Sequence, residues 1–210
     1  MRYDVKLAES FRLSKITAEF LNAIEAMSDV KKAVGVFGSA RTKPGEKYYD
    51  TAETIGRLLA ENGFAVITGG GPGLMEAANK GAFEAGGVSV GLNINLPFEQ
   101  HINAFVNVSV DFQYFFVRKV MFVKQADAMI VMPGGMGTFD ELFEILTLVQ
   151  TRKKKNFKIV LVGSDFWSGM LQWLRTTVIE NGMISPEDID LFQVMDEPEE
   201  IIEYIKGGKS

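Results

Sequence analysis

A strand, a glycine-rich turn and the start of a helix follow one another in Ala128-Met129-Ile130-Val131-Met132-Pro133-Gly134-Gly135-Met136-Gly137-Thr138-Phe139-Asp140-Glu141. The first five residues are apolar, as is typical of a buried strand. A glycine turn that opens a helix exposes backbone N–H groups to an anion. The helix also places a carboxylate within its first turn. The sequence therefore predicts a phosphate-binding turn with an acidic side chain beside it.

Apolar, strand-sized segments alternate with helical segments on both sides of this stretch, which is typical of βαβ units. We predict an α/β, Rossmann-like, doubly wound fold with a mainly parallel sheet of about seven strands and helices on both faces. The strands are expected at Ala33–Phe37, Phe64–Thr68, Val88–Leu92, Ala104–Val110, Ala128–Met132, Phe157–Val162 and Leu191–Met195. The helices are expected at Glu9–Met27, Glu46–Asn62, Leu74–Ala85, Phe112–Gln125, Gly137–Gln150, Phe166–Asn181 and Glu197–Ile205.

The length of 210 residues fits one domain of ordinary size. No internal repeat or linker divides the chain, so we predict a single Rossmann-like domain over residues 1–210. The helix over about residues 9–27 is expected to pack onto this domain.

Composition excludes several kinds of chemistry. The chain has no cysteine, which rules out disulfides, zinc thiolate sites and cysteine nucleophiles. A single histidine, His101, argues against a multi-histidine metal site and a Ser-His-Asp triad. The net charge of −5 favours small anionic ligands over a nucleic-acid polymer. No apolar run approaches the roughly 20 residues of a membrane span, and the N-terminus lacks a signal-peptide core, so we expect a cytoplasmic protein.

Three predicted strands end in small residues, at Gly38-Ser39-Ala40, at Gly69-Gly70-Gly71-Pro72-Gly73 and at Gly134 to Thr138. Ligands of open parallel sheets bind outside the carboxyl ends of the strands, where the strand order reverses. The three turns are therefore expected to converge on one crevice, although glycine in any one of them can simply permit a tight turn. The dinucleotide pattern Gly-x-Gly-x-x-Gly is missing at the first strand exit, which argues against an NAD enzyme.

Charged residues near these turns have structural explanations beside the functional ones. Glu141 lies in the first helical turn, where an acid can compensate the helix dipole, but Asp140 already serves that purpose. Glu144 and Thr147 continue the polar stripe that Asp140 begins. Arg118 and Lys119 lie together on an aromatic-rich helix and can either be solvated or reach a nucleotide.

These motifs together resemble the Lonely Guy family of cytokinin riboside 5′-monophosphate phosphoribohydrolases, a Rossmann-like group also labelled "possible lysine decarboxylase". The signature Pro-Gly-Gly-x-Gly-Thr-x-x-Glu matches Pro133 to Glu141, and a Gly-Gly-Gly-x-x-Gly-Leu-Met turn matches Gly69 to Met75. The resemblance runs from about Lys32 to Val162. One difference is the context of the Arg-Lys pair, where Phe115-Phe116-Val117 replaces the usual Met-His-x.

The resemblance implies that Arg118 and Glu141 are the catalytic pair, with no metal and no cofactor. The residues expected to bind substrate are Gly38, Ser39, Gly70, Gly71, Met75, Glu99, Lys119, Gly134, Gly135, Met136, Gly137, Thr138, Asp140 and Thr147. The family's dimeric habit further implies a homodimer, with an interface that involves Phe112 to Phe122.

We predict hydrolysis of the N-glycosidic bond of a nucleoside 5′-monophosphate, such as AMP or an N6-modified AMP of the cytokinin riboside type. The products are the base and ribose 5-phosphate. The alternative is a non-catalytic protein of the same fold that carries a nucleotide or a pterin cofactor. Binding of single-stranded DNA is disfavoured by the acidic charge. Lysine decarboxylation is rejected because no lysine lies in a recognisable pyridoxal phosphate context.

Overall fold

Seven parallel strands form one sheet in the computed structural model, which describes residues 2–96 and 101–207. The strands are β1 (Ala33–Phe37), β2 (Ala65–Thr68), β3 (Ser89–Ile94), β4 (Val108–Phe112), β5 (Ala128–Val131), β6 (Lys158–Leu161) and β7 (Gln193–Val194). They lie in the order β4-β3-β2-β1-β5-β6-β7. Because β1 pairs with both β2 and β5, the direction of winding reverses between β1 and β5. The predicted α/β fold with its parallel sheet is confirmed.

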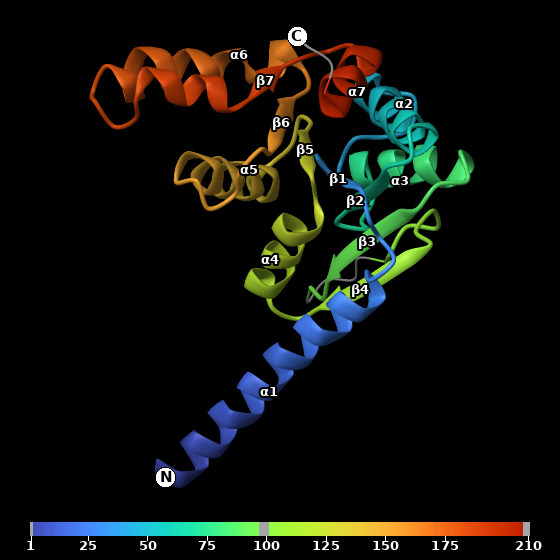
Figure 1. Cartoon of the computed structure of the whole chain (residues 1–210), viewed down its shortest axis with the longest axis vertical. Coiled ribbons are helices and arrows are strands. Elements are labelled where there is room, and N and C mark those ends of the chain that lie inside the picture. The colour runs from blue at the N-terminus through green and yellow to red at the C-terminus, as the bar shows by residue number, and fades with distance from the viewer. Residues whose placement is uncertain (1, 97–100, 208–210) are drawn as a thin grey trace.

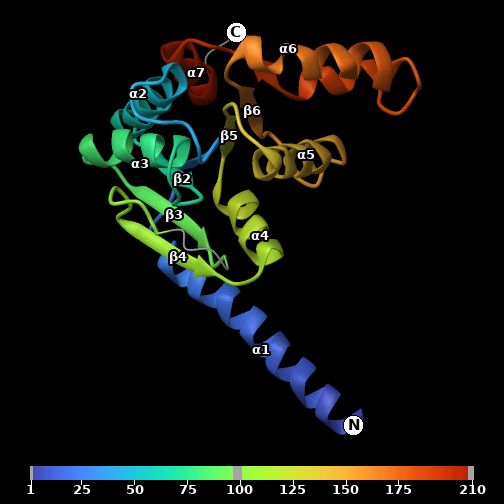
Figure 2. The same cartoon turned by 180° about the vertical axis from the view of Figure 1, so that it is seen from behind.

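Helices cover both faces of the sheet (Figure 1 and, from behind, Figure 2). They are α1 (Arg2–Ala26), α2 (Lys47–Glu61), α3 (Leu74–Glu84), α4 (Phe115–Gln125), α5 (Met136–Gln150), α6 (Ser164–Trp173) and α7 (Pro198–Lys206). A π-helical segment, η1 (Leu174–Ile179), continues α6, and a 3₁₀ helix, η2 (Pro186–Leu191), precedes β7. One face carries α2, α3 and α7, and the other carries α4, α5, α6 and the end of α1.

The strands feed two hydrophobic cores because successive side chains point to opposite faces. In β1, Val34 and Val36 join the core beneath α2 and α3, whereas Ala33 and Phe37 join the core beneath α4 and α5. Every residue of β1 is buried. A strand covered on both faces needs apolar residues throughout, which explains the continuous apolar runs in the sequence.

The fourth strand begins and ends later than predicted. It covers Val108–Phe112 rather than 104–110, and α4 consequently begins at Phe115 rather than Phe112. Side-chain hydrogen bonds of Asn103 and Asn107 hold the chain before β4, in place of a regular ladder. Such polar side chains compete with strand pairing, and the apolar pattern of the sequence does not report this competition.

The N-terminal helix starts at Arg2, seven residues before the predicted start. The apolar residues on which the prediction rested begin at Phe11, so the residues before Glu9 were not assigned to the helix. The C-terminal end of α1 packs against β4 and α4, and the Glu19 carboxylate accepts hydrogen bonds from the N–H groups of Gln113 and Tyr114 at 3.0 and 3.4 Å. The rest of the helix projects away from the sheet (Figure 1). Within residues 2–96 and 101–207, no helix is both long and apolar enough to span a membrane.

Candidate active site

A cleft of about 790 Å³ lies at the carboxyl ends of the strands, where the winding reverses between β1 and β5. This is the position that ligands take in open α/β sheets, and the volume is in the range of small-molecule sites. The exits of β1, β2 and β5 all contribute to its wall, as predicted from their small residues. The predicted site residues that line it are Gly38, Ser39, Met75, Arg118, Gly134, Gly135, Met136, Gly137, Thr138, Asp140 and Glu141.

The turn between β5 and α5 presents backbone to this cleft. The Ser39 N–H donates to the Pro133 carbonyl at 2.9 Å, which ties the β1 exit to the β5 exit. A Cβ on Gly134 would lie 2.1 Å from Thr138 Oγ1, so the threonine hydroxyl occupies the space above this glycine. A Cβ on Gly135 or Gly137 would meet nothing within 4 Å. The turn therefore has free space at both glycines, and the start of a helix, where N–H groups lack intrahelical partners, suits an anion such as phosphate.

Glu141 lies one turn inside α5 and is 7% exposed. Burial raises the pKa of its carboxyl to about 7, and the positive charges of Arg118 and Lys119 oppose this shift. A carboxyl group with this pKa is divided between its acid and carboxylate forms near neutral pH, which is the condition for proton transfer in catalysis.

Arg118 comes from α4 and reaches the cleft beside Glu141. Its Nε donates to the Leu92 carbonyl at 2.7 Å, and its Cζ lies 5.2 Å from the centroid of the Phe122 ring. A Cβ on Gly69 would lie 2.4 Å from Arg118 Nη2, so only glycine leaves room for the guanidinium here. Burial lowers the pKa of Arg118, and the charge of Glu141 opposes the shift.

Lys119, which was expected to bind substrate, does not line the cleft. Its Nζ lies 2.9 Å from Asp140 Oδ1 and 2.6 Å from Glu144 Oε2, which ties α4 to α5. Burial disfavours the charged form of Lys119, but its hydrogen bonds to Glu144 and Asp140 hold its pKa above the usual value. Thr147 lies with Lys119 at a separate hollow of about 530 Å³, and its hydroxyl donates to the Phe143 carbonyl.

Two further predicted residues do not line the cleft. Gly70 and Gly71 are buried beneath it, and Gly70 has a φ of 73°, a conformation that favours glycine. Glu99 lies outside the described residues.

A buried polar network beneath the Gly69–Gly71 turn was missed by sequence reasoning. Asn103 Nδ2 donates to the carbonyls of Gly70 and Gly71 at 3.2 and 3.1 Å and lies 3.0 Å from Asn79 Oδ1. The Thr68 hydroxyl accepts from the Gly70 N–H at 2.9 Å and pairs with Asn79. No motif marks Asn103, because it lies in a segment predicted as an irregular loop.

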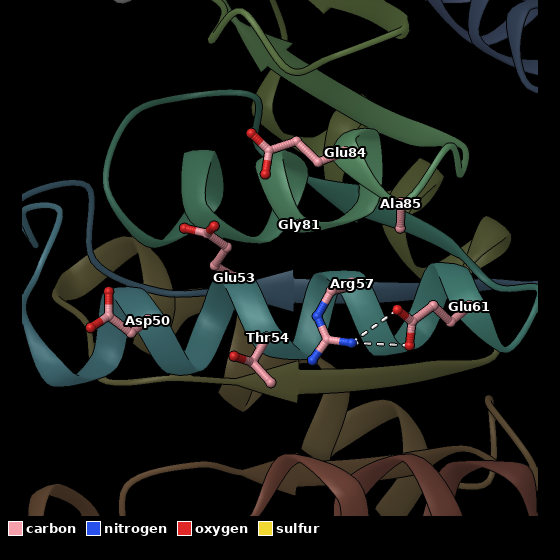
Figure 3. Close-up of a pocket in the computed structure, with 8 residues that line it drawn as sticks. All are labelled: Asp50, Glu53, Thr54, Arg57, Glu61, Gly81, Glu84 and Ala85. Carbon is pink, nitrogen blue, oxygen red and sulfur yellow. Dashed lines mark hydrogen bonds and ion pairs between the residues drawn. The ribbon is translucent and has the colours of Figure 1, made fainter.

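A second hollow, of about 420 Å³, lies between α2 and α3 away from the strand exits (Figure 3). It forms where Gly81 lets the two helices approach closely, since a Cβ there would be 1.9 Å from the Glu53 carbonyl oxygen. Arg57 pairs with Glu61 at 2.9 Å within α2, as Figure 3 shows, and Lys80 pairs with Glu53 at 2.9 Å. Ion pairs therefore occupy Arg57, Glu61 and Glu53 on this surface.

Comparison with known proteins places the chain in a family. Residues 75–205 match the family described as "Possible lysine decarboxylase". The chain is 30% identical over 161 residues to the cytokinin riboside 5′-monophosphate phosphoribohydrolase of Rhodococcoides fascians, with 74% of this chain and 79% of that protein covered. The chain belongs to this family, the Lonely Guy family. A Lonely Guy relative from Mycobacterium tuberculosis with the same description is 30% identical over 154 residues, covering 70% of this chain and 79% of that protein.

Solved structures share the Lonely Guy fold and carry different descriptions. The molybdenum cofactor binding protein of Rippkaea orientalis is 25% identical, with a TM-score of 0.63, 84% of this chain covered and 96% of that chain. The molybdenum cofactor carrier protein of Chlamydomonas reinhardtii is 23% identical, with a TM-score of 0.60 and coverage of 84% and 97%, and shows the fold alone.

Proposed function

We propose that this protein hydrolyses the N-glycosidic bond of a nucleoside 5′-monophosphate, such as AMP or an N6-modified AMP, and releases the base and ribose 5-phosphate. The observation that carries the proposal is Glu141, a buried carboxyl with a pKa near 7, one turn inside a helix whose N-terminus faces the same cleft. A phosphate at that N-terminus would bring the attached ribose within reach of the carboxyl group.

The 5′-phosphate would bind the N–H groups at the start of α5, beside the Thr138 hydroxyl. This fixes the ribose so that the anomeric carbon faces Glu141, and the reaction becomes effectively intramolecular. As the bond to the base lengthens, positive charge develops on the ribose, and the ionised Glu141 stabilises this charge. Glu141 also accepts a proton from the attacking water, whose oxygen bonds to the anomeric carbon. The base leaves with the bonding electrons and takes up a proton from solvent.

Arg118 would act on the same carbon from the α4 side of the cleft. Its hydrogen bond to Leu92 and the open space at Gly69 hold the guanidinium near Glu141. Its charge favours the carboxylate form of Glu141, which the proposed reaction needs. The descriptions of the Rhodococcoides and Mycobacterium relatives as phosphoribohydrolases support the proposed hydrolysis.

A second candidate is a carrier that binds a nucleotide or a pterin cofactor without cleaving it. The structural likeness to the Rippkaea molybdenum cofactor binding protein favours it. A carrier needs the N–H groups of α5 but has no need of a buried acid at Glu141. This acid therefore favours the enzyme.

The test is a base-release assay with a panel of nucleoside monophosphates, following ribose 5-phosphate, for wild type and Glu141→Gln. We expect turnover to fall by about 10²–10⁴-fold while nucleotide affinity is retained, because the phosphate site is untouched. Glu200→Gln is the control, since it changes an exposed glutamate of α7 outside the cleft, and should keep its turnover. Full turnover by Glu141→Gln would contradict the mechanism. Tight binding without release from any substrate would favour the carrier.

A further inference from the structure

The cleft continues beyond the phosphate position, on the side away from Arg118. The exits of β3, β2, β1, β5 and β6 form a row about 19 Å long, given the usual spacing of about 4.8 Å between neighbouring strands. Ile94 and Arg118 line one end of the cleft, and Tyr48 and Phe166 line the other. The N-terminus of α5 lies between these ends. A nucleoside monophosphate that reaches from α5 toward Arg118 would leave the Phe166 end unfilled.

Tyr48 is held rigidly at this end. Its hydroxyl donates a hydrogen bond to the Asp165 carboxylate, which joins the first turn of α2 to the first turn of α6. Burial and the neighbouring Asp165 raise the pKa of Tyr48 to about 12, so the phenol remains a neutral donor. A Cβ on Gly163 would lie 3.0 Å from both the Tyr48 ring and Pro133, which places the ring directly beside the turn before α5.

Phe166 and Arg41 complete this end of the cleft. The Phe166 ring is 44% exposed and stands edge-on to the buried Trp167, with centroids 4.9 Å apart. Arg41 follows the β1 exit, where its N–H donates to the Ser39 hydroxyl at 3.0 Å. Within residues 2–96 and 101–207, its guanidinium has neither an ion pair nor a hydrogen bond, although it lines the cleft.

We propose that Arg41, Tyr48 and Phe166 form a distal subsite for a group attached beyond the 5′-phosphate. Arg41 would bind a second phosphate, and the two aromatic rings would stack a flat ring such as a second base. The ligand class is a nucleoside 5′-diphosphate whose second phosphate carries an aromatic group, as in a dinucleotide. This inference rests on the proposed function, because it takes the first phosphate to lie at α5.

The experiment compares three probes by calorimetry in the Glu141→Gln background, which prevents turnover during titration. The probes are AMP, ADP and diadenosine diphosphate, in which a pyrophosphate joins two adenosines. We expect diadenosine diphosphate to bind about tenfold more tightly than AMP, the scale of one stacked base, with ADP in between. Phe166→Ala should remove the advantage of diadenosine diphosphate over ADP. Arg41→Gln should remove the advantage of ADP over AMP.

Two matched controls lie on the same elements but outside the cleft. Trp173→Ala removes an exposed aromatic residue of α6, and Lys43→Gln removes an exposed cation of the loop before α2. Both variants should keep the preference for diadenosine diphosphate over AMP. Equal affinity for AMP and diadenosine diphosphate, or a preference that survives in Phe166→Ala, would overturn the distal subsite alone. A preference for diadenosine diphosphate over AMP, together with a wild type that releases no base from any nucleoside monophosphate, would overturn the proposed hydrolysis alone. Absence of binding by all three probes would overturn both.

Discussion

Glu141 is buried at a position where its charge is unfavourable for folding. Its pKa is raised by burial to about 7, whereas an exposed glutamate titrates near 4.5. The unfolded chain therefore releases this proton at lower pH than the folded chain does. Glu141 does not reduce the free energy of unfolding below about pH 4.5. This free energy falls as the pH rises toward 7, where ionisation of the buried Glu141 carboxyl costs on the order of 3 kcal/mol.

Glu141→Gln should therefore raise the thermal stability in a pH-dependent manner, because glutamine stays neutral. We expect a gain in Tm of roughly 6–12 °C at pH 8 and almost none at pH 4.5, measured by calorimetry of both proteins across this range. Glu200→Gln serves as the control, since Glu200 is exposed on α7. A gain from Glu141→Gln that is the same at every pH would show that Glu141 has an ordinary pKa.

The sequence was sufficient to select Glu141 as a candidate but not to predict its pKa. Its place near the start of a helix follows from the Pro-Gly-Gly-x-Gly-Thr motif. Its burial depends on α4, whose Arg118 lies 23 positions earlier in the chain, and on the packing of α4 against the sheet. Lys119 shows the same limit, because the family's Arg-Lys pair implied a binding role, whereas the structure pairs its side chain with Asp140 and Glu144.

The turn between β2 and α3 sets the position of Arg118. Sequence reasoning selected Gly70 and Gly71 as binding residues, yet Gly69 is the glycine that lines the cleft and touches the guanidinium. A glycine run identifies the turn but does not distinguish its members, since their roles depend on which neighbour approaches. The hydrogen bonds from Asn103 to the Gly70 and Gly71 carbonyls, which support this turn, likewise join distant parts of the chain.

Gly69→Ala should lower turnover far more than it lowers stability. The added Cβ would lie 2.4 Å from Arg118 Nη2 and 2.8 Å from Met75 Sδ, which are the ends of flexible side chains that can move aside. We expect kcat for base release to fall by about a hundredfold and the free energy of unfolding to change by about 1 kcal/mol or less.

Gly169→Ala is the control for this experiment, because a Cβ there meets nothing within 4 Å on α6. Unchanged kcat in Gly69→Ala, with a folded protein, would show that the position of Arg118 is not critical.

At the scale of the whole molecule, apolar side chains remain uncovered along α1, α4 and α5. The exposed residues on these helices include Phe11, Leu13, Leu21, Phe115, Phe116, Val120 and Phe143. Large exposed apolar surfaces commonly mark protein interfaces. Part of the predicted Phe112 to Phe122 interface is unavailable, because Phe112, Val117, Met121 and Phe122 belong to the core.

We propose a homodimer in which Phe116 and Val120 contribute to the interface. Wild type should sediment as a dimer at micromolar concentration, and the double variant Phe116→Asp with Val120→Asp should sediment as a monomer, because paired carboxylates oppose apolar contact. Met183→Asp changes an exposed apolar residue in the turn after η1 and should remain dimeric. A wild-type monomer, or a double variant that stays dimeric, would exclude this interface.

The sequence predicted the fold class and the identity of most elements, because apolar runs and glycine turns alternate so regularly. The order of the strands could not be predicted, since it depends on which face each crossover helix covers. The location of the cleft was nevertheless predictable. Small residues at the β1, β2 and β5 exits are adequate evidence once the strands are known to be parallel.

The contact of Lys119 with Asp140 and Glu144 has a consequence for how a ligand is received. Lys119 is the chain neighbour of Arg118, and Asp140 is the chain neighbour of Glu141, so the bridge joins the two helices directly behind the two proposed reactive groups. The separation of Arg118 and Glu141 is then determined during folding. A ligand would meet a preorganised site, and its association would be a single step without a preceding closure of α4 on α5.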